Sequence, residues 1–174
     1  MRSATTTPAL IPPFFQAARE VLEQELGLDA APGPIQALDL GDLPGDDATV
    51  LVAITGDLEG TAFYRYSLPC ALGIVSRIIG SPMTELDELA RSGIAELGNV
   101  ITGRAGVLLA DQGWTCTIAP PVVVAGQAVR VHAPYRPVWQ SAMSTPFGAV
   151  IVSIAVRPVR PAAAVDGVFQ PERG

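Results

Sequence analysis

Asn99 is the single asparagine of this chain, and it follows Glu96 by three positions in a segment with helical periodicity. At about 100° per residue of an α-helix, Ser92, Glu96, Asn99 and Gly103 fall within an arc of roughly 60°. These four residues, which we call the stripe, therefore share one face of the predicted helix. A carboxylate and a carboxamide on one rigid element are the first place to look for chemistry.

The helix that carries the stripe is predicted to run from Thr84 to Gln112, with Thr84 as its cap and Asp87 in its first turn. Its apolar residues recur at helical spacing and should face a core, which leaves the stripe at their border and reachable. They are Leu86, Leu89, Ala90, Gly93, Ile94, Leu97, Val100, Ile101 and Leu108. Arg104 falls within this apolar arc. A helix break, a buried pair and a contact with another chain all stay open as its explanation.

The stripe also has a plain structural interpretation, because a Glu followed three positions later by an Asn is frequent on solvated helix faces. The small residues around it favour a further role. Gly98, Gly103 and Gly106 each cost roughly 1 kcal/mol relative to alanine in a helix interior. Either close packing on a sheet or second helix, or close approach of another molecule to the stripe, has to compensate for them.

Composition bounds the class of protein. The chain has 174 residues, of which 49% are hydrophobic, and this is enough to form a core without disulfides or metals. We predict one domain over 11–159, between disordered tails at 1–10 and 160–174. A net charge of -6 without any lysine disfavours nucleic acid as a partner. No apolar run approaches the roughly 20 residues of a membrane helix, so we expect a soluble, cytoplasmic protein.

Few residues suit nucleophilic or metal chemistry. Cys70 and Cys116 are the only cysteines, and we interpret them as buried thiols in a reducing compartment. His132 is the sole histidine, which weighs against a Ser-His-Asp triad, a Cys-His pair or a histidine-rich zinc site. The acidic residues between 42 and 47 are explained by a solvated loop. We therefore predict no metal ligands.

Two further helices, Pro12–Gly27 and Leu68–Ile79, surround the stripe helix in the prediction. Strands are predicted at 34–40, 49–55, 61–66, 114–119, 122–125, 128–133, 137–143 and 147–156, with a tight hairpin at 56–60. A helix followed by strands thus occurs twice. The order predicts an α/β domain of the α+β layered kind, built from two related helix-plus-three-strand halves. Its long helices should pack on one face of a mainly antiparallel sheet.

The pattern Ser92-x-x-x-Glu96-x-x-Asn99 in a glycine-bearing helix is followed by Pro120-Pro121 and by the apolar run Val122–Gly126. Together these residues resemble the CheC, CheX and FliY phosphatases of bacterial chemotaxis, and most of all the CheX type. The likeness extends from the first helix to the final strand and covers neither tail. CheC-like members carry the motif on two pseudo-symmetric helices and CheX-like members on one, as here.

The resemblance implies removal of the phosphoryl group from the phospho-aspartate of a CheY-like response regulator, which also supplies the bound Mg²⁺. The chain would need no cofactor of its own. Asn99 would orient the attacking water, Glu96 would pair with a lysine of the regulator, and Ser92 and Gly103 would contact the regulator. The family also suggests a homodimer through sheet edges. The apolar strand 147–156 is either such an edge or a central strand.

Two alternatives stay open. The chain could be a noncatalytic docking module, related to the flagellar switch proteins, that binds phosphorylated regulator without hydrolysing it. It could also be a generic interaction domain whose stripe is only a solvated face. The presence of both Glu96 and Asn99 favours the phosphatase. The lifetime of the phosphorylated regulator separates the three, because only a phosphatase shortens it.

Overall fold

Each long helix is followed by a run of strands, and this order occurs twice along the chain. The computed structural model describes residues 7–126 and 128–159. The first run comprises α1 (Thr7–Leu10), α2 (Pro12–Glu20), the π-helical turn η1 (Val21–Glu25), β1 (Ala31–Pro32), β2 (Gln36–Leu38), β3 (Asp42–Pro44), β4 (Ala48–Gly56) and β5 (Leu58–Tyr66). After α3 (Leu68–Ile79), the second run comprises α4 (Glu88–Ala110), β6 (Cys116–Ile118), β7 (Val122–Ala125), β8 (Arg130–His132), β9 (Val138–Thr145) and β10 (Gly148–Pro158).

Eight of the strands form one antiparallel sheet in the order β1-β9-β10-β5-β4-β6, with β2 also paired to β9 and β7 to β4. β10 pairs with β5 on one side and with β9 on the other. Of the two interpretations of the apolar segment 147–156, the central strand is therefore correct. Its apolar character follows from burial between two neighbours, and it offers no edge for a dimer.

The two runs are arranged symmetrically about the centre of the sheet. β5 and β10 lie at the middle, and β4 and β9 flank them. The first strands of each run attach to the other run, since β1 and β2 pair with β9 while β6 and β7 pair with β4. β3 and β8 pair with each other in a separate ribbon, and α2 packs on α4. The prediction of two related halves is confirmed, with five strands in the first half, where three were predicted, and five in the second, which matches the five ranges predicted there.

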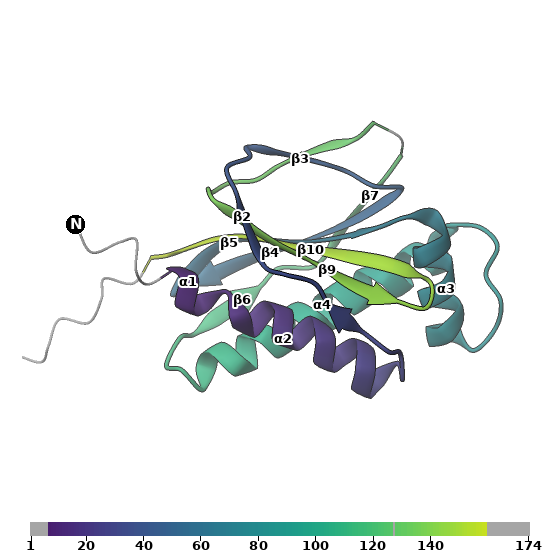
Figure 1. Ribbon diagram of the computed structural model, residues 1–174, viewed down its shortest axis with the longest axis horizontal. Helices are drawn as coiled ribbons and strands as arrows, with labels where there is room; N and C mark the ends of the chain where they lie inside the picture. Colours follow the sequence, from purple (N-terminus) through teal and green to yellow (C-terminus); the bar gives the residue numbers. More distant parts are fainter. Residues whose placement is uncertain (1–6, 127, 160–174) are drawn as a thin grey trace, which may run out of the picture.

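Helices cover one face of the sheet and the β3–β8 ribbon lies on the other (Figure 1). The alternation of side chains along β5 serves both layers, because successive residues of a strand point to opposite faces. Phe63 packs in the cluster under the ribbon, whereas Tyr64 packs in the larger cluster under the helices. No helix among the described residues is long and apolar enough to cross a membrane.

The helix termini show where local sequence rules decide the fold. α3 has its predicted bounds, with Ser67 as the N-cap and Gly80 in the left-handed conformation at its end. α4 begins at Glu88 and not at Thr84. The side chain of Asp87 accepts a hydrogen bond from Ala90 N at 2.8 Å and so caps the helix instead. The prediction of Thr84 as the cap is therefore wrong, and Asp87, predicted in the first turn, is the N-cap.

The N-terminal boundary of the domain differs from the prediction. The predicted tail 1–10 contains α1, and Leu10 is only 2% exposed within the main core. The domain therefore begins by Thr7, because a buried leucine anchors the segment that precedes α2. Residues 1–6 and the predicted tail 160–174 lie outside the described residues.

Candidate functional site

The inner face of α4 is pressed onto the sheet. A Cβ at position 98 would lie 2.8 Å from Val50 Cγ1, so only glycine allows this approach. Ile94 and Ile101 are fully buried on the same side. Close packing thus explains Gly98, whereas a Cβ at Gly106 would meet no atom within 4 Å. A Cβ at Gly103 would touch only Ile118 Cδ1, at 3.8 Å.

The stripe lies on the outward face of α4. Ser92 and Glu96 are exposed, and Asn99 and Gly103 are half-buried. Within the described part of the chain, the side chains of Glu96 and Asn99 have no hydrogen-bond or ion-pair partner. The predicted reachability of the stripe is confirmed, and the side chains of Glu96 and Asn99 are available to another molecule.

Two apolar side chains lie on the same outward face. Leu89 is 56% exposed and Val107 is 54% exposed. On a regular helix they lie about two turns before and three turns after Glu96, at nearly the same angle around the axis. The prediction that Leu89 faces the core is wrong, because Ala90, its neighbour, is the buried residue of that turn. The outward face is thus apolar toward both ends and polar in the middle.

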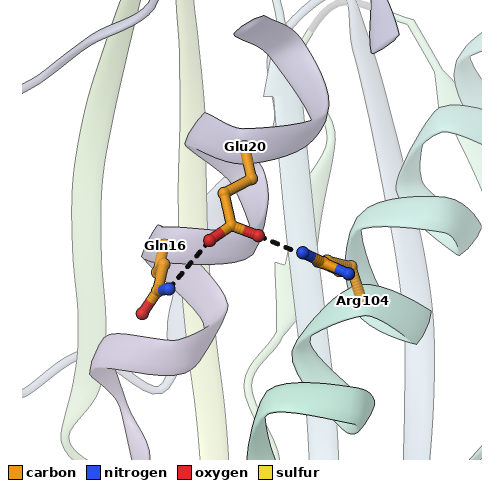
Figure 2. Close-up of polar contacts among 3 residues, drawn as sticks. All are labelled: Gln16, Glu20 and Arg104. Atoms are coloured by element: carbon orange, nitrogen blue, oxygen red, sulfur yellow. Dashed lines mark hydrogen bonds and ion pairs between the residues drawn. The ribbon is translucent and has the colours of Figure 1, made fainter. Parts of the chain in front are cut away.

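Arg104 reaches from α4 to α2 (Figure 2). Its Nε donates to Glu20 Oε2 at 2.8 Å, and Gln16 Nε2 donates to Glu20 Oε1 at 2.8 Å. The hydrogen bond from Gln16, followed by the interaction with Arg104, lowers the pKa of the Glu20 carboxyl. α4 continues through this position without a break. A partly exposed pair between two helices therefore explains Arg104, and neither a helix break nor another chain is needed.

Pro120 and Pro121 lie at the edge of the sheet, between β6 and β7. Both of these strands pair with β4, and Ala119 N donates to Ala53 O at 2.9 Å just before the prolines. Proline cannot donate a ladder hydrogen bond, so the pair interrupts the edge strand. α4 packs against β6 and β7 on either side of this interruption.

The other chemical candidates of the sequence have structural roles. Cys70 is fully buried, and burial raises the pKa of its thiol to about 11. Cys116 is half-buried, and its pKa is also raised by burial. His132 Nδ1 lies 3.1 Å from Asp42 Oδ1 on the β3–β8 ribbon. Within residues 7–126 and 128–159, no group of three or more His, Cys, Asp or Glu side chains is placed to hold a metal ion.

Comparison with known proteins identifies the family. Residues 48–144, which include the whole stripe, match the family model of the chemotaxis phosphatase CheX. The CheY-P phosphatase CheX of Thermotoga maritima is 35% identical over 126 residues, which are 72% of this chain and 78% of that protein. The chain belongs to the CheX family. The resemblance predicted from the residues around the stripe is thereby confirmed.

Solved CheX structures share the fold. CheX from Desulfovibrio desulfuricans superposes with a TM-score of 0.76 at 25% identity, over 83% of this chain and 97% of that one. CheX from Borrelia burgdorferi, solved as a complex with CheY, BeF3 and Mg²⁺, has a TM-score of 0.73 at 24% identity, over 85% and 97%. The layered sheet and helices described above are thus the CheX fold.

Proposed function

We propose that this CheX-family protein hydrolyses the aspartyl phosphate of a CheY-like response regulator, with Asn99 as the catalytic residue and Glu96 as the anchor for the regulator. One observation carries the assignment of these roles. The only asparagine side chain and a carboxylate lie together on the outward face of α4 without partners among the described residues. The activity itself follows from the family and from the T. maritima relative, a CheY-P phosphatase.

Asn99 suits the orientation of the attacking water. In-line attack needs a water held opposite the leaving oxygen, and a carboxamide can both donate to that water and accept from it. A neutral group adds no charge that would repel the phosphoryl oxygens. The water oxygen bonds to phosphorus while the bond from phosphorus to the aspartyl oxygen breaks. The products are inorganic phosphate and the free carboxylate of the regulator.

Glu96 suits the anchoring of the regulator. Its exposed carboxylate lies about one turn before Asn99, so a lysine of the regulator that pairs with it would fix the rotation of α4 over the phosphorylated aspartate. The charge would be costly to bury without such a partner. Ser92 and Gly103 complete the contact by being small, which lets the regulator approach the helix closely.

We propose that the Mg²⁺ comes with the regulator. The stripe contains a single carboxylate and a single carboxamide, whereas a protein-bound Mg²⁺ requires six oxygen ligands in octahedral geometry and is usually held by carboxylates together with phosphate oxygens. These residues alone do not fit a resident ion. The B. burgdorferi complex holds CheX, CheY and Mg²⁺ together, which supports the same division of roles here.

We also propose a cytoplasmic location and a homodimer formed through sheet edges. Both cysteines are free thiols, which agrees with a reducing, cytoplasmic environment. A homodimer through sheet edges would have to use β6 and β7 or β1 and β2, because β10 is internal. The homodimer stays a prediction, which the mass of the particle in solution would decide.

Phosphate decay from a phosphorylated CheY-like regulator tests the proposal. The wild-type protein should accelerate the decay, Asn99→Ala should abolish the acceleration while binding persists, and Glu96→Ala should weaken both. Gln36→Ala is the matched control, because it removes an exposed carboxamide on β2, and it should behave as wild type. Decay that is unchanged against several regulators would contradict a phosphatase. Tight binding in the same mixtures would then favour the docking module.

A further inference from the structure

A buried hydrogen-bond chain joins α4 to the sheet directly beneath the stripe. Tyr64 Oη on β5 lies 2.8 Å from Thr102 Oγ1, and Thr102 Oγ1 donates to Gly98 O at 2.7 Å. Thr102 has one hydroxyl proton and gives it to Gly98 O, so Tyr64 is the donor and Thr102 the acceptor. Tyr64 is 0% exposed and Thr102 is 1% exposed. Both hydrogen bonds are therefore shielded from water.

The hydrogen-bond chain from Tyr64 through Thr102 ends at the peptide group that joins Gly98 to Asn99. The Gly98 carbonyl belongs to the peptide bond that continues into Asn99 N, so Thr102 holds this unit directly. The same turn is held from below, because a Cβ at Gly98 would lie 2.8 Å from Val50 Cγ1 and 3.1 Å from Tyr64 Cδ2. The hydrogen bonds and the close packing, both of which involve Tyr64, thus fix the height and the rotation of α4 beside Asn99.

We propose that Tyr64 and Thr102 are positioning residues that set the orientation of Asn99 through the Gly98 carbonyl. This inference rests on the proposed function. A water held for in-line attack tolerates little displacement, and a shift of about 1 Å can cost on the order of 100-fold in rate. Binding of the regulator depends on the whole outward face and should tolerate such a shift better. Loss of the hydrogen bonds of Tyr64 and Thr102 should therefore lower kcat more than it raises KM.

Tyr64→Phe is the first variant, since it removes one hydroxyl without changing the packing volume. We expect kcat for dephosphorylation to fall about tenfold while KM stays within about twofold. Tyr66→Phe is the matched control on the same strand and the same face. Tyr66 is also 0% exposed, and its hydroxyl has no hydrogen-bond partner among the described residues. The control should leave both kinetic constants unchanged.

A double variant separates positioning from stability. Thr102→Val should lower kcat and the urea midpoint, because it leaves the buried Tyr64 hydroxyl unpaired. Thr102→Ser retains the hydroxyl and should restore kcat. The double variant Tyr64→Phe with Thr102→Val lacks both hydroxyls, so no buried hydroxyl is left unpaired. Its urea midpoint should therefore be higher than that of Thr102→Val alone, while kcat stays low. A merely structural role would make kcat follow the midpoint.

The outcomes distinguish this inference from the proposed function. Wild-type kcat in Tyr64→Phe, together with an inactive Asn99→Ala, would overturn the positioning role alone. A kcat that recovers with stability in the double variant would do the same. An active Asn99→Ala would overturn both, since there would be no catalytic carboxamide to position.

Discussion

At the scale of single residues, the outward face of α4 differs from an ordinary solvated helix face in two ways. Its central polar side chains, Glu96 and Asn99, have no partners in the described part of the chain. Its flanking residues Leu89 and Val107 are large, apolar and more than half exposed. Scattered apolar residues on a surface need no explanation, but two at the same helix angle as a candidate site favour a binding face.

Leu89→Ser and Val107→Ser should therefore weaken binding of the regulator and leave the chemical step intact. Full burial of a leucine or valine side chain contributes about 1.5–3 kcal/mol, and about half of each side chain is still exposed, so KM should rise roughly four- to twelvefold for each variant while kcat stays within about twofold. Ile35→Ser is the control, since Ile35 is 45% exposed and lies outside α4. An unchanged KM in both α4 variants would restrict the binding face to the stripe.

Helical spacing alone was enough to predict the stripe, because residues that share an arc in sequence share a face in any regular helix. The same spacing assigned Leu89 to the buried face, which is wrong, because periodicity does not show where along its length a helix loses contact with the sheet. Tyr64 and Thr102 were missed for a different reason. Their contact joins residues 38 positions apart on different elements, and no local pattern reports such a contact.

At the scale of elements, the ion pair between Glu20 and Arg104 connects the two long helices. Their side chains are 21% and 45% exposed, so the pair is screened by solvent and should contribute about 0.2–1 kcal/mol. Glu20→Gln and Arg104→Gln should each lower the free energy of unfolding by about that amount at low salt. The loss should shrink in about 0.5 M salt.

A double-mutant cycle from urea unfolding gives the coupling between Glu20 and Arg104. The pair Arg19–Glu23, 3.0 Å apart within the first run of the chain, is the control, because it joins residues in successive turns of one helical segment. It should contribute about 0.3–0.5 kcal/mol. Zero coupling between Glu20 and Arg104 at low salt would show that apolar packing alone holds α2 to α4.

The bounds of a helix were predicted correctly where its capping residues had no nearby competitor. α3 has a serine cap, a continuous apolar face and a terminal glycine, and both of its ends were predicted correctly. The start of α4 was predicted three residues too early, because the cap was predicted at Thr84 and Asp87, which caps the helix, was placed in its first turn. β1 and β3 are too short for an alternating pattern, and they exist because β9 and β8 offer them hydrogen-bond partners.

At the scale of the whole molecule, the buried side chains of Cys70, Tyr64 and Tyr66 make stability depend on alkaline pH. Burial raises the pKa of Cys70 from 9.0 to about 11, and it raises the pKa values of Tyr64 and Tyr66 above their ordinary range. The folded state therefore binds more protons than the unfolded state above pH 9. Their stabilising contribution is complete below that pH and decreases as pH rises through the folded pKa values.

Urea midpoints measured from pH 7 to pH 11 should consequently fall above about pH 9, most steeply near pH 10 and beyond. Cys70→Ala should make the fall between pH 9 and pH 10 shallower, because one of the three groups is gone. A midpoint that stays constant up to pH 11 would mean that the unfolded and folded states titrate alike, contrary to the burial of these groups.

The exchange of first strands between the two runs has a consequence for the site. Ala31 pairs with Ser144, and Ile54 pairs with Ile118, so the sheet edge of each half is supplied by the other. Neither half can complete its hydrogen-bond ladder before the other is present. Domains with many contacts of such long sequence separation fold slowly, in roughly milliseconds to seconds, and we expect the two halves to unfold in one cooperative transition. The stripe lies on a single helix, but that helix unfolds together with both halves of the sheet. Substitutions that destabilise β1 or β2 should therefore also unfold the stripe, although they lie far from it in the sequence.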